Sequence, residues 1–348
     1  MLNIFSISIR ILITISLLLC LACSGDNPLG PAGQLPEAIG WVEQESPVEG
    51  ITLTAVDFID ERRGWAVGKN GVIINTRNGG ANWYEQQSGT ENTLRDVDFV
   101  DSRNGWAVGH NGTILYTNDG GRKWVAQFSG TTSRLEEVTF VDRQSGWAAG
   151  RSMFVLLRTT DGGDTWTEDT LSQFRMLSNL NFADGNRGRA MLDLRQVVST
   201  TDGGSSWTVL SKPVRGYAWG MSFLDEKYGL IVSTTYETFE GRVDWYDKVF
   251  KTVDGGNNWS LVFRRPGGYS FGGKAFIMSR NDILMVSITQ IERSTDGGLS
   301  WTVQYRPTNS WSIWDATFVS SDIGWAVGRD GLILHTTNGG VTPSTVSE

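Results

Sequence analysis

Short apolar runs recur along the chain, and Gly, Asn or Asp bounds each of them. In one stretch the runs occupy residues 97–100, 105–109, 113–117 and 124–127. Each run is rich in β-branched or aromatic residues, which is typical of strands joined by tight turns. Nothing after residue 22 has a sustained helical period. The pattern therefore predicts an all-β fold whose repeating unit has four strands.

A turn of the form Asp/Asn-Gly-Gly marks the repeat. It occurs seven times, at spacings of 41, 42, 41, 52, 42 and 42 residues. The turns begin at Asn78, Asp119, Asp161, Asp202, Asp254, Asp296 and Asn338. A period in the low forties with four short strands is that of one propeller blade. We expect residues 41–343 to form a seven-bladed β-propeller with four-stranded blades.

The turn between the third and fourth strands of each unit follows the Asp-box pattern S/T-x-D-x-G-x-S/T-W. Residues 294–301 match this pattern in full. In such a turn the carboxylate can accept backbone N–H bonds, the glycines supply positive φ, and the Trp packs beneath. Seven equivalent side chains spread around a ring cannot converge on one substrate. We therefore expect these residues to cap turns and to have no catalytic role.

The two ends of the repeat region predict how the ring closes. The last repeat ends shortly after Asn338 without the Trp that opens a fourth strand. Residues 41–45 resemble the fourth strand of the first repeat, at residues 83–87, and have no repeat of their own. An open propeller would expose sheet edges. We expect residues 41–45 to pair with residues 332–336 and complete the last blade.

The N-terminus has the features of a secretory signal. Arg10 precedes an apolar run at residues 11–19, and small residues lead to Cys23. The sequence Leu-Ala-Cys-Ser at residues 21–24 resembles a bacterial lipobox, which implies a lipid on Cys23. We expect a signal peptide at residues 1–22, a flexible tether at 23–40 and a short tail at 344–348. The alternative is ordinary secretion with a free Cys.

Such a protein would lie outside the cytoplasm, attached by its lipid anchor in the periplasm, at the outer membrane or on the cell surface. From Cys23 onward the chain carries 29 basic and 38 acidic residues, a net charge of −9. This balance argues against a general nucleic-acid binder. His110 and His335 are the only histidines, and no Cys follows Cys23, so no metal or cofactor site is predicted. No nucleophile-and-base motif is present either, and we predict no enzymatic activity.

The motif Gly-Trp-Ala-x-Gly accompanies the Gly-Gly turns in four repeats. It occurs at residues 64–68, 105–109, 146–150 and 324–328. With these motifs the chain resembles the photosystem II stability and assembly factor family of seven-bladed propellers. The resemblance implies a non-catalytic scaffold that holds a membrane-protein intermediate through an arginine-rich surface. A protein partner is therefore expected.

The candidate partner-binding face combines arginines with tryptophans that the repeat does not use. Arginines that fall between a fourth strand and the next first strand are Arg95, Arg134, Arg175, Arg215, Arg264, Arg265 and Arg306. The surplus tryptophans are Trp219, Trp245, Trp311 and Trp314. We place all of them in loops on the face opposite the Asp-box turns, and we expect blades five to seven to contact the partner. Exposed Trp and Arg dominate interface energetics.

Other interpretations remain open for these residues. The tryptophans could plug the wide end of the channel or cover their own loops, and the arginines could simply be solvated. A carbohydrate-binding or adhesive lectin is an alternative function. A sialidase-like glycosidase is another, because paired carboxylates about 5 to 10 Å apart hydrolyse glycosides. Its candidate residues are Glu237, Glu240, Asp244 and Asp247, beside Tyr236 and Tyr246.

Overall fold

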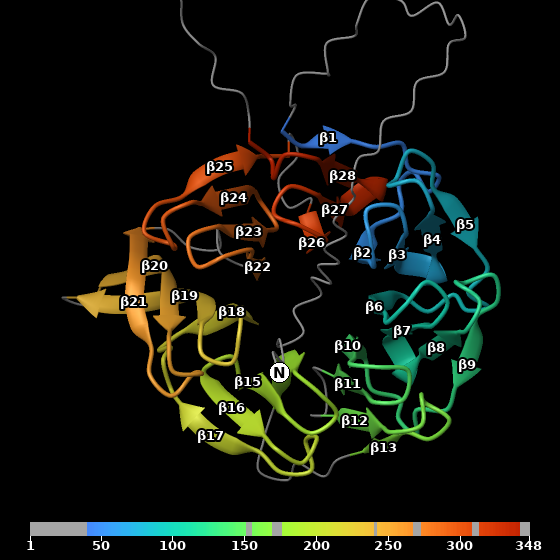
Figure 1. Cartoon of the computed structure of the whole chain (residues 1–348), viewed down its shortest axis with the longest axis horizontal. Helices are drawn as coiled ribbons and strands as arrows, with labels where there is room; N and C mark the ends of the chain where they lie inside the picture. Colours follow the sequence, from blue (N-terminus) through green and yellow to red (C-terminus); the bar gives the residue numbers. More distant parts are fainter. Residues whose placement is uncertain are drawn as a thin grey trace, which may run out of the picture.

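The computed structural model describes residues 40–150, 155–168, 176–239, 242–266, 273–307 and 313–341. They form seven four-stranded antiparallel sheets, which are arranged in a ring around a common centre (Figure 1). In each sheet the strands follow the chain from the centre outward, except in the blade that joins the two ends. The seven-bladed propeller predicted from the repeat is confirmed.

The first four blades use consecutive strands. Blade one contains β2 (Leu53–Phe58), β3 (Gly64–Gly68), β4 (Ile73–Thr76) and β5 (Tyr84–Gln86). Blade two contains β6 (Leu94–Phe99), β7 (Gly105–Gly109), β8 (Ile114–Thr117) and β9 (Val125–Gln127). Blade three contains β10 (Leu135–Phe140), β11 (Gly146–Gly150), β12 (Leu156–Thr159) and β13 (Thr167–Glu168). Blade four contains β14 (Leu177–Phe182), β15 (Gly188–Leu192), β16 (Gln196–Thr200) and β17 (Thr208–Ser211).

The remaining blades include the longest hairpin and the closing strand. Blade five contains β18 (Tyr217–Phe223), β19 (Gly229–Phe239), β20 (Arg242–Thr252) and β21 (Ser260–Pro266). Blade six contains β22 (Gly273–Ile277), β23 (Ile283–Ser287), β24 (Ile291–Ser294) and β25 (Thr302–Tyr305). Blade seven contains β26 (Ile313–Phe318), β27 (Gly324–Gly328), β28 (Ile333–Thr336) and β1 (Val42–Glu43). Short 3-10 turns link second and third strands at η1 (Lys69–Gly71), η2 (His110–Gly112) and η3 (Arg329–Gly331).

The N-terminal strand closes the ring, as the sequence predicts. In β1, Val42 lies opposite His335 and Glu43 opposite Leu334 of β28. The strand is shorter than residues 41–45, but the Gln44 N–H still donates to a β28 carbonyl at 2.9 Å. Trp41 is buried with its ring edge-on to Phe318, at a centroid distance of 5.8 Å. Blade seven is thus held by both ends of the chain.

The Gly-Trp-Ala-x-Gly motif joins neighbouring blades. The Trp106 ring stacks on Phe140 of the next blade at a centroid distance of 3.5 Å, and its Nε1 donates to the Gly162 carbonyl at 3.0 Å. A Cβ atom at position 105 would collide with the ring of Phe99, so this position requires Gly105. The same stack forms at the other three motifs. The Trp of each motif therefore packs against the next blade. The Gly that opens the motif leaves space for the Phe of its own blade, and in blades one to three the Trp of the preceding blade stacks on that Phe.

The Asp-box turns are closed by their own side chains. In the third blade, Asp161 accepts from the Thr159 hydroxyl at 2.7 Å, and from the N–H and hydroxyl of Thr165 at 2.9 and 2.6 Å. The bonds from Thr165 are the main reason that the pKa of Asp161 falls to about 2. In all seven turns a Ser or Thr hydroxyl donates to the Asp or Asn side chain two residues later. These side-chain oxygens are thus engaged within the turns.

Candidate binding surface

The central channel opens into a cavity of about 390 Å³ lined mainly by the inner strands of the blades. Arg95, Glu136, Trp219, Lys274 and Trp314 contribute to its wall. They come from blades two, three, five, six and seven, so the cavity is shared around the ring. We refer to this cavity as the channel mouth. Three of the residues predicted for a partner face, Arg95, Trp219 and Trp314, meet in its wall.

β-Bulges aim four of these side chains. The pairing register of β6, β10, β18 and β26 shifts near the start of each strand. The residues within the shifts are Arg95, Glu136, Trp219 and Trp314. A bulge redirects the side chain that it carries. The prediction that Arg95, Trp219 and Trp314 lie in loops is wrong, because the bulge interrupts the alternation by which a strand is recognised in the sequence.

The two tryptophans offer apolar surface and a hydrogen-bond donor. The side chain of Trp314 is 47% exposed, and the Arg95 guanidinium lies 5.6 Å from its ring centroid. Trp219 is half-buried, and its indole N–H has no hydrogen-bond acceptor among the described residues. A buried donor without an acceptor costs about 1 to 3 kcal/mol. A carbonyl or carboxylate of a bound molecule would remove that cost.

The arginines at the mouth are partly neutralised. Arg95 donates to Glu136 at 2.8 Å, and Arg134 pairs with the same carboxylate. Arg95 is therefore held beside Trp314 by an ion pair as well as by the ring. The Glu136 carboxylate is thus shared by two guanidinium groups.

Deeper in the channel, polar side chains cap the free edges of the inner strands. The backbone N–H of Phe99 donates to Asp57 at 2.8 Å, and the N–H of Val138 donates to Asp96 at 2.8 Å. Equivalent bonds cross from one blade to the next at Asp98, Glu137, Asn179 and Asp315. An inner strand has no further strand to pair with, so its N–H groups need such acceptors.

Lys274 places a positive charge among these carboxylates. Its Nζ lies 2.7 Å from Asp315. Burial lowers its pKa, but the neighbouring carboxylates outweigh that effect and hold it above the ordinary value. Burial in turn raises the pKa of Asp57 to about 7, of Asp96 to about 6 and of Glu137 to about 7. The channel therefore contains carboxyl groups that titrate near neutral pH.

Sequence reasoning missed these channel residues. A signal was present, because Asp57 and Asp98 occupy the same position in successive repeats, as do Asp96 and Glu137. Polar residues that recur on the innermost strand of a propeller face its channel. Lys274 carries no such signal, since no other repeat has a Lys at that position.

The remaining arginines of the predicted face are used elsewhere. Arg264 and Arg265 lie on β21, an outer strand, and not in the following loop as predicted. Arg265 forms two bonds to Glu292, at 2.7 and 2.9 Å. Arg306 donates to Gln290 at 2.9 Å. Arg215 is exposed.

The long repeat spacing comes from an extended hairpin. β19 and β20 pair over eleven residues each, so Trp245 lies on a strand and not in a loop as predicted. Its ring contacts Tyr236 at a centroid distance of 5.5 Å. Arg264 lies over Tyr246 of the same hairpin, 3.8 Å from the ring centroid. This hairpin carries an aromatic surface separate from the channel mouth.

Two of the four carboxylates considered for a glycosidase pair with basic side chains of blade five. Glu237 accepts from Lys248 and from Arg264, both at 2.7 Å. Asp247 is fully buried, and Arg265 lies 3.5 Å from it. Cys23, Arg175, Glu240 and Trp311 lie outside the described residues.

Within the residues that the structure describes, no group of three or more His, Cys, Asp or Glu side chains is arranged to hold a metal ion. No helix in this part of the chain is long and apolar enough to cross a membrane.

Residues 82–175 match the family model of the photosynthesis system II assembly factor YCF48. The fold is similar to that of YCF48 bound to a D1 peptide, with a TM-score of 0.65 and 20% identity over 87% of this chain and 99% of that one. YCF48 from Cyanidioschyzon merolae gives a TM-score of 0.64 at 18% identity, over 85% and 98% of the two chains. The chain is thus a BNR-repeat propeller that is similar to YCF48 in fold and, over residues 82–175, in sequence.

The propeller fold is also shared with enzymes. A GH74 xyloglucanase from Xanthomonas campestris is 14% identical, with a TM-score of 0.65 over 86% of this propeller and 53% of the enzyme. At this identity the likeness shows the fold alone. No curated protein sequence matches the chain.

Proposed function

We propose that this propeller is a non-catalytic scaffold that binds a protein partner at the channel mouth. The observation that carries the proposal is the group formed by Trp314, Arg95 and Trp219 around one cavity. Trp and Arg are the residues that most often dominate binding energy at protein interfaces. An apolar ring beside a fixed guanidinium and an unused indole N–H suits a peptide segment, which has both apolar side chains and carbonyl acceptors.

A related structure supports a protein partner. YCF48 has been solved with a D1 peptide, so a propeller of the same type binds a peptide. For this chain the proposal extends to holding a membrane-protein complex during its assembly or maintenance. The partner itself is to be found by experiment.

The N-terminal sequence supports a place for this activity. We propose that the mature protein begins at a lipid-modified Cys23 and works outside the cytoplasm. Residues 23–40, rich in Gly and Pro, would let the propeller reach a complex in the same membrane. A lipid anchor would also raise the local concentration of the scaffold near membrane proteins.

The experiment compares capture by three forms of the intact lipoprotein in its native membrane. A photo-cross-linking residue is placed next to the mouth, and the cross-linked protein is identified and its yield measured. Trp314→Ala should lower that yield at least about fivefold, which corresponds to about 1 kcal/mol. Phe128→Ala is the matched control, because Phe128 is 89% exposed on an outer part of blade two. Equal yields from the unaltered and Trp314→Ala proteins, with both folded, would exclude the channel mouth.

A further inference from the structure

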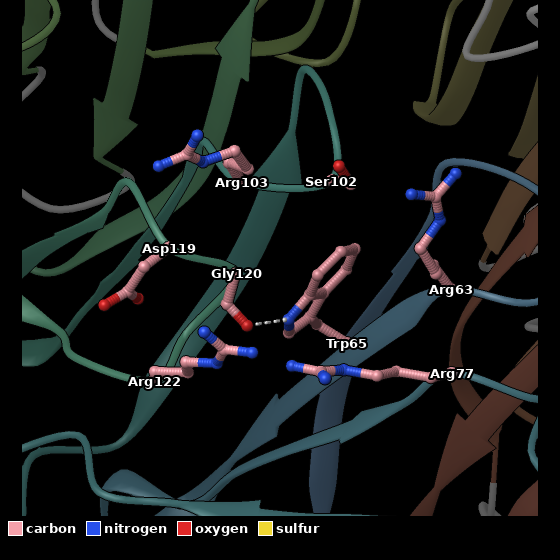
Figure 2. A pocket seen from close by; sticks show the side chains of 8 residues that line it. All are labelled: Arg63, Trp65, Arg77, Ser102, Arg103, Asp119, Gly120 and Arg122. Carbon is pink, nitrogen blue, oxygen red and sulfur yellow. Dashed lines mark hydrogen bonds between the residues drawn. The ribbon is translucent and has the colours of Figure 1, made fainter.

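A second groove lies between blades one and two, on the side of the Asp-box turns. It encloses about 370 Å³. Its lining residues are Arg63, Trp65, Arg77, Ser102, Arg103, Asp119, Gly120 and Arg122 (Figure 2). Four of the eight are arginines, in a chain whose net charge is −8. We refer to it as the arginine groove.

The topology brings these arginines together. Arg63 and Arg103 lie in the hairpins between first and second strands, and Arg77 and Arg122 lie in the turns between third and fourth strands. Strands alternate in direction within a blade, so both kinds of connection emerge on the same face. The side chains at the channel mouth lie near the opposite ends of the inner strands. The arginine groove and the channel mouth therefore occupy opposite faces of the propeller.

Two guanidinium groups converge in the groove. Figure 2 shows Arg77 and Arg122 extending toward each other beside the Trp65 ring. The indole Nε1 of Trp65 donates to the Gly120 carbonyl at 3.2 Å, which fixes the ring between the two blades. All four arginines are exposed. Substituting them should therefore leave the core intact.

Acceptors within the groove do not balance this charge. Asp119 is the carboxylate that lines it, and that side chain already accepts from the Thr117 hydroxyl at 2.9 Å and the Lys123 N–H at 3.0 Å. Arg63 pairs with Asp60 of its own hairpin. Among the described residues, Arg77 and Arg122 form no ion pair within 4.0 Å. Asp119 interacts electrostatically with Arg122, but it is one carboxylate in a lining that contains four arginines, so the lining carries a net positive charge.

The junction between blades four and five shows how the same position is neutralised. Arg187 directly precedes the second strand of blade four, as Arg63 does in blade one. It pairs with Asp184 of its own hairpin at 2.9 Å, as Arg63 pairs with Asp60, and its Nη1 also lies 3.1 Å from Glu226 of the next blade. Glu226 is the third residue after its inner strand, and the third residue after the inner strand of blade two is Ser102. The arginine groove therefore has a serine where the other junction has a carboxylate.

We propose that the arginine groove binds an acidic segment of a protein partner, whose carboxylates take the place that Glu226 fills at the other junction. The planar guanidinium fork matches a carboxylate with two parallel hydrogen bonds. A groove with four arginines has room for more than one carboxylate, which favours a run of Asp or Glu over a single small anion. This contact is additional to the one at the channel mouth and lies on the other face.

The test measures binding of a fluorescent oligoglutamate peptide to the full-length mature protein by anisotropy at low salt. Arg77→Ala combined with Arg122→Ala should weaken binding at least about tenfold. Ser102→Glu should weaken it to a similar degree, because the new carboxylate would pair with the arginines as Glu226 does. Both effects should shrink as salt screens the charges.

A matched control separates the groove from net charge. Lys69→Ala combined with Arg329→Ala removes two exposed positive charges from the opposite face and should change binding less than about twofold. Peptide binding unchanged by Ser102→Glu would overturn the proposal. So would tighter binding of inorganic phosphate, or of vesicles containing anionic lipid, than of oligoglutamate. Trp314→Ala should leave peptide binding unaltered, so this test is independent of the one for the channel mouth.

Discussion

The junction between blades two and three differs from that between blades four and five, although both hold the same kind of sheets together. At the first, the Trp106 ring stacks on Phe140 at a centroid distance of 3.5 Å, and its indole N–H donates to the Gly162 carbonyl in a turn of blade three at 3.0 Å. At the second, the guanidinium of Arg189 lies 4.4 Å from the Phe223 ring and donates to the Glu226 carbonyl at 2.8 Å. Both of these junctions thus use a flat group that covers a Phe and donates one hydrogen bond.

The difference extends to the channel. Beside the first junction the acceptor for the next inner strand is the carboxylate of Asp96, and beside the second it is the amide of Asn179. The repeat therefore conserves geometry within this chain while the charge changes from blade to blade. Because the charge at equivalent positions can vary, the junction between blades one and two has an excess of arginines, whereas the junction between blades four and five has an ion pair between its blades.

The largest effect is expected where a junction depends on the chain ends. A chain that begins at Thr52 lacks β1 and Trp41, so blade seven loses its outer strand and an edge is exposed. It should be less stable than a chain beginning at Glu37 by several kcal/mol, about 3 to 5 for the buried Trp alone. Thermal and urea unfolding measure this loss. Equal melting temperatures for the two chains would show that the ring does not depend on this strand.

Next in size is the ring at an ordinary junction. Trp106→Ala removes a fully buried side chain and its hydrogen bond, and should cost about 3 to 5 kcal/mol. Arg189→Ala should cost less, about 1 to 2 kcal/mol, because the guanidinium is partly solvated and its removal leaves one neutral carbonyl acceptor without this donor. Urea denaturation of both variants gives the two values. A larger loss for Arg189→Ala would reverse the proposed ranking of the junctions.

A smaller effect should appear as a change in pH dependence. The pKa of Asp96 is raised from 3.8 to about 6 in the folded protein, mainly by burial. Folding therefore favours its protonated form, and its contribution to stability is lost as pH rises from about 4 through about 6. Asp96→Asn keeps an oxygen for the Val138 N–H and removes the titration.

The measurement is the free energy of unfolding across that pH range. In Asp96→Asn the decline between pH 4 and 7 should be smaller by about 2 kcal/mol. Asn179→Ala, at the neutral junction, should lower stability by an amount that does not vary with pH. An unchanged pH profile in Asp96→Asn would mean that Asp96 does not titrate in this range.

The smallest expected effect is at a turn. Asp161→Ala removes the acceptor for Thr159 and Thr165 and should cost about 1 to 2 kcal/mol. Capture at the channel mouth should be the same as for the unaltered protein, because the turn lies on the other face. Loss of capture at unchanged stability would contradict a purely structural role for this carboxylate.

The amino-acid sequence by itself determined the blade number, the strand order and the closure. These follow from local signals repeated at a fixed spacing: Gly-Gly turns that need positive φ, Trp positions, and a spare strand that fits a missing one. The same signals recur in most blades, so the repeat can be recognised in the sequence even though blades four to six lack the Gly-Trp-Ala-x-Gly motif.

Only the tertiary structure decided which side chains meet. Arg95, Trp219 and Trp314 lie at β-bulges of inner strands and not in the loops expected from the sequence, and they line one cavity. The extra residues of the 52-residue repeat spacing form a long hairpin, in which β19 and β20 pair at eleven positions and which includes Trp245. Local spacing does not encode these outcomes, because both depend on partners in other strands and blades. The arginine groove depends on tertiary structure for the same reason. It is recognised only when the junction that contains Ser102 is compared with the equivalent junction that contains Glu226.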